Sequence, residues 1–291
     1  MFLNYKTFKH PMFTKLNFGT AGVPISSKSR NIIDGIDRLK KLTLDNMEIE
    51  FVRQVYIKEE NAAKIKEFSE KNNILLTCHG QYYINLNSKE KEKQDASKTR
   101  IYDAAKIAYF CGAKSITFHA GFYQGMDKEK TYQTIKENMI EILERLKKDK
   151  INITIRPETT GKPTQFGSLN ELVRLSKELR EKGYDVLPCV DFAHLHARSG
   201  GGFNSEDEFE SILKLLKSEL DCLDNMHIHL AGINYSEKGE RNHLCLEDSD
   251  MNWKTLLKVW KKFDIKGIVT CESPNIEEDA LLLRKYYNNL K

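Results

Sequence analysis

The sequence predicts one eight-fold β/α barrel, the (β/α)8 or TIM-barrel fold, as a single domain spanning residues 1–291. Short apolar runs alternate with amphipathic, charge-rich stretches from one end of the chain to the other, with no long linker between them. Alternating β and α units predict a parallel sheet, and eight such units predict that the sheet closes into a barrel. The length of 291 residues fits, because one barrel of this kind needs roughly 250 residues.

The β units are short apolar runs bounded by polar or turn-forming residues. In chain order the eight predicted strands are Leu16–Ala21, Met47–Arg53, Ile74–His79, Ser115–His119, Ile151–Glu158, Val186–Asp191, Met226–Ala231 and Gly267–Glu272. Between them lie helical patterns, of which the clearest are Lys89–Cys111, Lys128–Lys148, Leu169–Lys182, Glu206–Leu220 and Trp253–Phe263. A last helix, Glu277–Leu290, closes the chain, and Ser168 with Glu171 forms a capping box at the start of another.

An open, doubly wound sheet is the competing α/β fold, and it carries a glycine-rich phosphate-binding turn after its first strand. Here the first strand leads into Gly19-Thr-Ala-Gly22-Val-Pro, which does not match the G-x-G-x-x-G pattern. The run Gly200–Gly202 follows the sixth predicted strand, not the first. The sequence therefore favours the closed barrel and predicts no nucleotide cofactor.

Composition argues against a membrane protein and leaves the partner open. Hydrophobic residues make up 40% of the chain, and no apolar run approaches the roughly 20 residues that a membrane span needs. The net charge of +4 permits a nucleic-acid partner without demanding one, because charge runs such as Lys89–Lys93 and Arg145–Lys150 are typical of solvated helix faces. Met1–Phe13 shows no signal peptide, and six cysteines without a C-x-x-C pair indicate reduced thiols, so we expect a cytoplasmic protein.

Side chains able to bind metal or transfer protons gather where the predicted strands end. Strands three to eight deliver, in order, His79, His119, Glu158, Asp191 with His194 just beyond, His227 with His229, and Glu272. The carboxyl ends of the strands form the rim on which barrel enzymes build their active sites. Six successive strands that each bring a His, Asp or Glu to this rim predict a functional site.

The period of two along each strand supports this interpretation, because residues two apart share a face. One layer below the strand ends, the inward positions would be Thr77, Thr117, Arg156, Cys189, His227 and Thr270. An inward arginine needs a carboxylate partner, and for Arg156 we expect Glu48 or Glu50 on the second strand.

So many imidazoles and carboxylates exceed what one metal ion can use, since zinc typically takes four ligands. Two or three ions clustered at the rim would leave positions for water and substrate. Such clusters suit in-line attack on phosphate, because the ions activate water and neutralise charge on the attacking and leaving oxygens. The residues therefore predict a metal-dependent enzyme that hydrolyses a phosphodiester.

Five short motifs together resemble the endonuclease IV family of DNA-repair enzymes. They are His79-Gly-Gln-Tyr82-Tyr-Ile-Asn85, Thr117-Phe-His119-Ala-Gly121, Glu158-Thr-Thr-Gly161, Asp191-Phe-Ala-His194 and Val-Thr-Cys-Glu272-Ser-Pro. They follow one another in the family's order from the third strand to the eighth and so span most of the chain.

The resemblance implies a site for three zinc ions, with Mn²⁺ as the alternative at one or more positions. The first ion would be held by His79, His119 and Glu158, the second by Glu158, Asp191, a strand-seven histidine and Glu272, and the third by His194. Glu158 and Glu272 would be the catalytic carboxylates. The implied reaction is that of an apurinic/apyrimidinic endonuclease in base excision repair. It hydrolyses the phosphodiester 5′ to an abasic site in double-stranded DNA and leaves a 3′-hydroxyl.

Contacts to DNA would come from Tyr82, Asn85 and Arg198. Tyr82 matches a tyrosine that members of the family place against the DNA at the lesion, and loop packing is its alternative role. Arg198, with His196, follows the D-x-x-H motif at a distance suited to a phosphate, which the planar donor fork of arginine binds well. An exposed loop without function is the alternative for this pair.

The sequence departs from the family pattern in three places. On strand seven, alignment of His229-Leu-Ala-Gly with the family's H-L-N-D favours His229 over His227 as the ligand. The D-x-H motif for the third ion is replaced by Arg-Asn-His243, with Glu240 as the substitute for the aspartate. The loop Arg53–Lys58 is short where bacterial members carry a DNA-penetrating segment, so the grip on DNA differs.

Two other functions compete with this hypothesis. A metal-dependent sugar isomerase or epimerase of the xylose isomerase-like barrels shares the architecture, but it uses one or two ions held mainly by carboxylates. A catalytically inactive DNA- or metal-binding barrel is the other, and it would not need the full set of ligands. Metal content separates the three.

Overall fold

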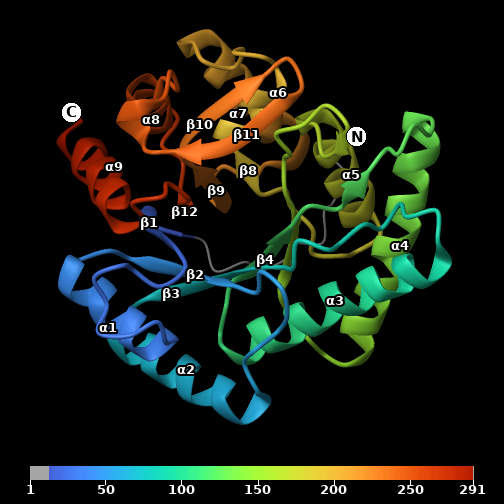
Figure 1. The fold of residues 1–291 in the computed structure, drawn as a ribbon, viewed down its shortest axis with the longest axis horizontal. Coiled ribbons are helices and arrows are strands. Elements are labelled where there is room, and N and C mark those ends of the chain that lie inside the picture. Colours follow the sequence, from blue (N-terminus) through green and yellow to red (C-terminus); the bar gives the residue numbers. More distant parts are fainter. Residues whose placement is uncertain (1–12, 291) are drawn as a thin grey trace.

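The computed structural model describes residues 13–290 and shows eight parallel strands at the centre with helices around them (Figure 1). The strands are β1 (Leu16–Ala21), β2 (Asn46–Glu50), β3 (Leu75–His79), β4 (Ser115–Phe118), β6 (Thr154–Pro157), β8 (Val190–Asp191), β9 (Met226–Leu230) and β12 (Gly267–Cys271). The segment Met1–Phe13, for which we expect no signal peptide, lies outside the described residues except for Phe13.

The sheet has the strand order β6-β4-β3-β2-β1-β12-β9-β8, with every neighbouring pair parallel. The two outermost strands meet through the parallel bridges Ile155 to Val186 and Glu158 to Cys189. These bridges close the cylinder, so the predicted (β/α)8 barrel is confirmed. The predicted sixth strand, Val186–Asp191, forms a continuous ladder only in its last two residues, β8. Its first part pairs with the neighbouring strand only through these two isolated bridges.

Nine α-helices surround the strands in the described part of the chain. They are α1 (Ile32–Leu42), α2 (Glu59–Asn72), α3 (Lys91–Phe110), α4 (Lys128–Lys148), α5 (Leu169–Glu181), α6 (Phe192–Arg198), α7 (Glu206–Leu220), α8 (Trp253–Lys262) and α9 (Glu277–Asn289). The predicted helices agree with these to within two residues at each end. The predicted capping box of Ser168 and Glu171 is present at the start of α5.

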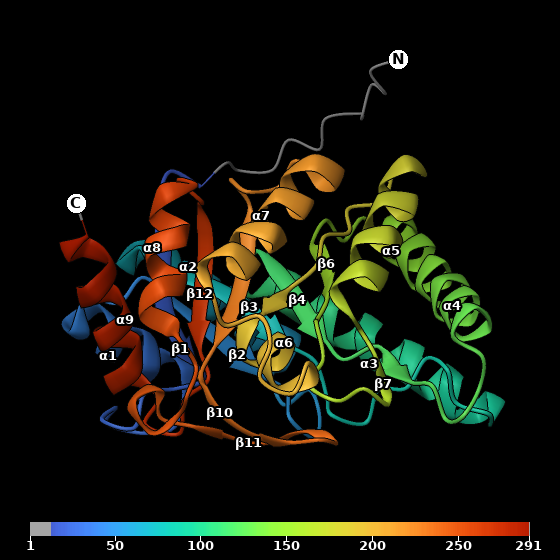
Figure 2. The ribbon, with the colours of Figure 1, turned by 90° about the horizontal axis from the view of Figure 1, so that it is seen from above.

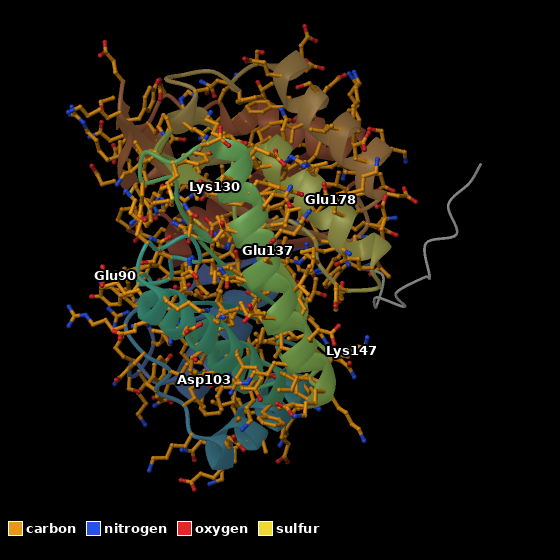
Figure 3. All side chains as sticks on the ribbon, turned by 90° about the vertical axis from the view of Figure 1, so that its right-hand side faces the viewer. Glu90, Asp103, Lys130, Glu137, Lys147 and Glu178 are labelled. Atoms are coloured by element: carbon orange, nitrogen blue, oxygen red, sulfur yellow. The ribbon has the colours of Figure 1, made fainter. Side chains whose placement is uncertain are left out.

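The charged runs lie on the outer faces of the helices, as expected. On α3 and α4, side chains such as Asp103, Lys130 and Glu137 point away from the barrel (Figure 3). Neighbouring helices exchange ion pairs across these faces, for example Lys136 with Glu178 at 2.8 Å. Exposed pairs of this kind contribute little to stability, so the charge runs are a solvated surface and not a binding patch.

Two small two-stranded antiparallel sheets, absent from the predicted elements, lie at the carboxyl-terminal rim, and only the first of them is a hairpin. β10 (Gly232–Ser236) pairs antiparallel with β11 (Gly239–Leu244), and β5 (Gly121–Phe122) pairs with β7 (Gln165–Phe166). Figure 2 shows the β10–β11 hairpin lying across one end of the barrel. Both small sheets are formed by loops that follow barrel strands, where functional residues of this fold are carried.

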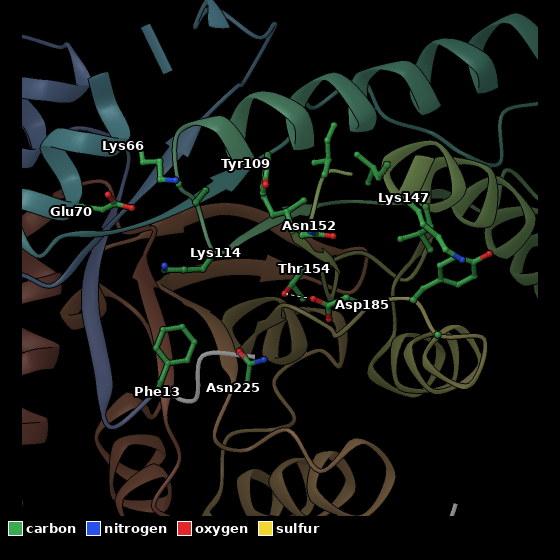
Figure 4. Close-up of a pocket in the computed structure, with 18 residues that line it drawn as sticks. Phe13, Lys66, Glu70, Tyr109, Lys114, Lys147, Asn152, Thr154, Asp185 and Asn225 are labelled. Atoms are coloured by element: carbon green, nitrogen blue, oxygen red, sulfur yellow. Dashed lines mark hydrogen bonds between the residues drawn. The ribbon is translucent and has the colours of Figure 1, made fainter. Parts of the chain in front are cut away.

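A cavity of about 540 Å³ lies at the opposite end of the barrel, where the strands begin (Figure 4). Thr154, Asp185 and Asn225 line it together with lysines of the surrounding helices, and Thr154 donates a hydrogen bond to Asp185 at 2.8 Å. This cavity is therefore remote from the residues at the strand ends. In the described chain no helix is long and apolar enough to cross a membrane.

Candidate metal centre

The predicted ligands converge on one spot at the carboxyl-terminal rim. His79 and Asp191 are the last residues of β3 and β8, and Glu158 and Glu272 directly follow β6 and β12. The parallel register of the strands places these ends side by side, and the period of two turns the side chains inward. His119 follows β4 in the same way.

The first group of ligand atoms surrounds the carboxylate of Glu158. The Nε2 atom of His79 lies 3.2 Å from Oε2 of Glu158, and Nε2 of His119 lies 3.5 Å from Oε1. Ligand atoms of the three residues all fall within 4.8 Å of one another. Glu158 is 1% exposed while the His119 side chain is 30% exposed, so this group opens to solvent on the side of His119.

The second group shares Glu158 with the first and adds Asp191, His229 and Glu272. The Nδ1 atom of His229 lies 3.3 Å from Oε1 of Glu158 and 3.4 Å from Oε1 of Glu272. One nitrogen and three carboxylates within 4.8 Å are a ligand set suited to zinc or manganese.

The third group combines Asp191, His194 and His243. Nδ1 of His194 donates to the carbonyl of Thr159 at 2.9 Å, which leaves its Nε2 facing Nε2 of His243 at 3.4 Å. Glu240 also approaches, with Oε2 3.5 Å from Nε2 of His194. The family's D-x-H motif has an aspartate here that this sequence lacks. The carboxylates that lie beside the two histidines are instead Asp191, within the group, and Glu240, at its edge.

The β10–β11 hairpin delivers His243 and Glu240 to this third group. Its backbone docks on the loop after β6, where the N–H of Glu240 donates to the carbonyl of Gly161 at 2.9 Å. The approach is close: a Cβ at Gly161 would lie 2.7 Å from Cβ of Glu240, and one at Gly239 would lie 2.3 Å from the Gly161 carbonyl oxygen. Glycine at both positions lets the hairpin reach His194.

Orphaned polar atoms test whether these groups suit metal ions. Oε1 of Glu158, Oδ2 of Asp191 and Nδ1 of His229 are buried and have no hydrogen-bond partner among the described residues. Buried polar atoms without a partner are rare and call for an explanation such as an ion. All three atoms lie at the junction of the groups, so the residues present fit bound metal.

The carboxylates are held in the ionised form that metal ligation needs. Burial alone would raise the pKa of Glu158, but the adjacent imidazoles of His229 and His119 outweigh it and hold that pKa well below 4.5. Burial is likewise outweighed at Glu272, where His229 lowers the pKa to about 2. Asp191 differs, since burial raises its pKa to about 6 against the attraction of His194.

The two strand-seven histidines occupy different layers. His229 belongs to the second group, whereas His227 lies one layer deeper, with Nε2 3.0 Å from Oε2 of Glu48 and Nδ1 3.0 Å from Oγ of Ser115. Burial lowers the pKa of His227 to about 4, so it stays neutral at pH 7. This geometry favours His229 over His227 as the ligand.

Strand β2 contributes two carboxylates, the buried Glu48 and the half-buried Glu50. The expectation that Glu48 or Glu50 pairs with Arg156 is wrong: the guanidinium donates to the carbonyls of Pro188 and Asn225 and to Oδ1 of Asn225. Glu48 instead faces the strand-seven histidines, and Glu50 sits beside His79 at the rim. Burial raises the pKa of Glu50 to about 8.

The residues predicted to contact DNA have different surroundings. Tyr82 is 65% exposed, with its ring 6.1 Å from that of His79, so it projects from the rim beside the first group. Asn85 directs Oδ1 to the backbone N–H groups of Asn87 and Phe122, which orders its loop.

Arg198 donates Nη1 to the carbonyls of Thr160, Lys162 and Gln165. This geometry favours a role in holding the loop after β6 over contact with a phosphate. His196 is fully buried between the carbonyl of Gly202 and Asp250, so it cannot reach a phosphate.

Known proteins with similar sequences include nucleases and one close relative of unspecified activity. An uncharacterised protein of Methanocaldococcus jannaschii is 46% identical over 94% of this chain and 98% of its own length. Apurinic-apyrimidinic endonuclease 1 of Plasmodium falciparum is 25% identical over 80% of this chain, which spans only 38% of that protein.

Solved structures show the same fold in two kinds of enzyme. Endonuclease IV of Thermus thermophilus superposes with a TM-score of 0.71 at 15% identity, covering 94% of this chain and 100% of the other. A D-tagatose 3-epimerase-like protein also reaches 0.71 at 18% identity, covering 94% and 97%. The sequence model of one family matches residues 36–287, and the chain therefore belongs to the xylose isomerase-like TIM barrel family.

Proposed function

We propose that this protein is a zinc-dependent endonuclease that cleaves DNA on the 5′ side of abasic sites. The observation that carries the proposal is the arrangement of three ligand groups that share Glu158 and Asp191 at one rim of the barrel. Bound metal ions would supply activated water and neutralise charge on a phosphodiester. The chain's own part is to hold the ligand atoms together in a buried, ionised cluster beside an open rim.

The third ligand group favours a phosphodiesterase over a sugar epimerase, the second candidate. The second group alone, with one histidine and three carboxylates, would satisfy an enzyme that uses a single ion. An additional group made of His194, His243 and Asp191 would serve no evident purpose there. A phosphate has more oxygens to neutralise, and clusters of ions act on phosphate for that reason.

The surface around the centre also suits a nucleic acid. The large apolar side chains that are exposed in the described chain all lie on loops that follow β1 to β4, beside the metal centre. They are Ile25, Tyr56, Tyr82, Tyr83 and Phe122. Exposed aromatic rings stack on nucleic-acid bases, so the four aromatic side chains in this set suit a nucleic-acid partner.

Incision of a labelled duplex that contains one tetrahydrofuran abasic analogue tests the proposal. The analogue cannot undergo β-elimination, so any cut must be hydrolytic. We expect zinc-loaded protein to cut 5′ to the analogue and leave a 3′-hydroxyl, and we expect Glu158→Gln to lose at least ~100-fold in rate, because it removes a charge shared by two ligand groups. Glu137→Gln, the same change on the exposed face of α4, is the control.

Metal analysis belongs to the same experiment, with about three zinc ions per chain expected from the three rim groups. An intact duplex after treatment with fully loaded protein would refute the abasic-site assignment. Turnover of a ketose to its epimer by that same preparation would then establish the second candidate.

A further inference from the structure

A chain of buried polar side chains runs beneath the metal centre, inside the barrel. Its members come from three strands: Ser115 from β4, Glu48 from β2, and His227 and His229 from β9. They are at most 3% exposed, and Glu48 and His229 are fully buried. The contacts run from Oγ of Ser115 to Nδ1 of His227 at 3.0 Å, and from Nε2 of His227 to Oε2 of Glu48 at 3.0 Å.

The chain ends on the metal centre itself. The other oxygen of Glu48, Oε1, lies 2.8 Å from Nε2 of His229, while Nδ1 of the same ring faces Glu158 and Glu272. His229 is thus held from below at one nitrogen and presents the other to the second ligand group. Both Glu48 oxygens and both histidine Nε2 atoms are buried, and none of the four has a hydrogen-bond partner of good geometry among the described residues, so they face one another at ion-pair distances.

The ring protons of His227 and His229 can be assigned from the atoms that each ring nitrogen faces. An ionised carboxylate only accepts hydrogen bonds, so we assign a proton to the Nε2 atom of each histidine, which lies 2.8 or 3.0 Å from a Glu48 oxygen. The Nδ1 atom of neutral His227 is then an acceptor, which the hydroxyl of Ser115 satisfies. The Nδ1 atom of His229 is left with a lone pair that points at the second ligand group, as metal binding requires.

We propose that Glu48 is a positioning residue that fixes the tautomer and ring orientation of His229 as a metal ligand. The inference rests on the proposed metal centre. Metal-binding histidines usually donate their second ring N–H to a carboxylate or a carbonyl, which orients the ring and makes the ligand more basic. Glu48 has the position, the burial and the lack of other partners that this role needs.

A metal ion in the deeper layer is the alternative. Ligand atoms of Cys189, His227 and His229 also fall within 4.8 Å of one another. An ion there would compete with the second ligand group for His229, because this residue belongs to both groups. Glu48 already lies within 3.0 Å of the Nε2 atoms of both histidines, and we therefore favour the positioning role.

The main test compares Glu48→Gln with native protein by retention of zinc against a competing chelator. Glutamine has the same shape, but its amide nitrogen cannot accept a hydrogen bond, so one histidine loses its partner. We expect one ion per chain to bind ~10- to 100-fold more weakly, the usual effect of losing such a partner, while the other ions are retained. Thr77→Val is the matched control, because Thr77 is the register neighbour of Glu48, fully buried, and its hydroxyl has no hydrogen-bond partner.

Two further measurements keep the test decisive if Glu48→Gln folds poorly. Ser115→Ala removes only the hydroxyl at the outer end of the chain, and a smaller loss of affinity for the same ion is expected. Nitrogen-15 NMR of the native protein should show the proton of both His227 and His229 on Nε2. A merely structural role of Glu48 would change the melting temperature without changing either the tautomers or the retention of one particular ion.

Three results would overturn the inference. One is equal zinc retention by the Glu48→Gln and Thr77→Val proteins. Another is native protein that binds no divalent metal at all. The third is a cobalt–thiolate charge-transfer band in the cobalt-loaded protein that Cys189→Ala abolishes, since it would place an ion in the deeper layer. None of these measurements uses DNA, so a protein that retains its metal as expected but cuts no abasic site would refute the proposed function and leave this inference standing.

Discussion

Glu158 is the side chain on which the whole centre depends. Its two oxygens face His79, His119, His194 and His229 at 3.2–3.5 Å, and it belongs to two of the ligand groups. A buried charge is tolerated only when it is paired, and here the imidazoles provide that pairing. Hydrogen bonds and charge from Glu158 likewise outweigh burial at His79 and raise its pKa to about 10. Because His79 would carry a proton at neutral pH, metal binding there must release it.

At the same scale, Glu50 makes folding stability depend on pH. Burial raises its pKa in the folded chain from 4.5 to about 8, so the folded state holds this proton more tightly than the unfolded chain. The stability that this provides is complete below about pH 4.5 and is lost as the pH rises through about 8. In protein stripped of metal, we expect Glu50→Gln to match native protein near pH 5 and to exceed it by on the order of 3 kcal/mol near pH 9.

Urea unfolding of both proteins across this pH range measures the difference. Comparing the two removes the contributions of the other titrating groups, which both proteins share. A constant difference between native protein and Glu50→Gln at every pH would show that Glu50 is ionised in the folded chain throughout.

Among the elements, the β10–β11 hairpin completes the third ligand group. It is a loop insertion after β9, its strands contact each other and α6, and it carries both His243 and Glu240. The other histidine of this group, His194, lies on α6. Asp191 caps that helix, because its Oδ1 atom accepts a hydrogen bond from the backbone N–H of His194 at 2.7 Å. One carboxylate thus sets the direction of a short helix and also joins two ligand groups.

The docking of the hairpin predicts the effect of adding a single methyl group at Gly161. In Gly161→Ala the new Cβ would lie 2.7 Å from Cβ of Glu240, so the hairpin must move away from His194. We expect about one zinc ion per chain to be lost from the third group, with a change in unfolding free energy of ~1 kcal/mol or less, because the hairpin lies outside the barrel. Zinc content after gel filtration, together with a thermal melt, measures both.

Lys238→Ala, an exposed change in the turn of the same hairpin, is the control. Full zinc content in Gly161→Ala would mean that the hairpin tolerates the shift or that His243 binds no metal. His243→Ala distinguishes these two explanations, since it removes the ligand without moving the backbone.

For the whole molecule, the barrel gathers at its rim several carboxylates whose negative charge bound ions would neutralise. Ions that bind the folded chain but not the unfolded one stabilise it by ~2.7 kcal/mol per site at a hundredfold excess over the dissociation constant. A protein of this size shifts its melting temperature by ~2–4 °C for each kcal/mol. We therefore expect removal of zinc by a chelator to lower the melting temperature by ~5 °C or more.

Differential scanning calorimetry before and after chelation, and again after zinc is restored, measures this shift. Recovery on re-addition separates metal loss from damage by the chelator. An unchanged melting temperature would argue that the rim groups do not hold metal under these conditions.

Much of the fold and of the candidate site follows from local patterns in the sequence. The alternation of apolar runs with amphipathic helices predicted a parallel sheet, and the count of eight βα units without a glycine-rich phosphate turn after the first strand favoured the closed barrel over the open sheet. The period of two along the strands then turned His79, Glu158 and Asp191 to the same rim. The clustering of these residues could be predicted without tertiary information, because parallel strands bring all their carboxyl ends to one side of the sheet.

Only the tertiary structure decided which distant segments meet. The contact of His243 with His194 joins residues 49 positions apart through a hairpin with no strong strand signal. Arg156 was expected to pair with Glu48 or Glu50, but it contacts Pro188 and Asn225 instead. The alternation along a strand predicts which face a side chain lies on, but it does not predict the neighbour across the barrel. The choice of His229 over His227 likewise depended on depth inside the barrel. These features arise from packing between strands that lie far apart in sequence, which no local pattern records.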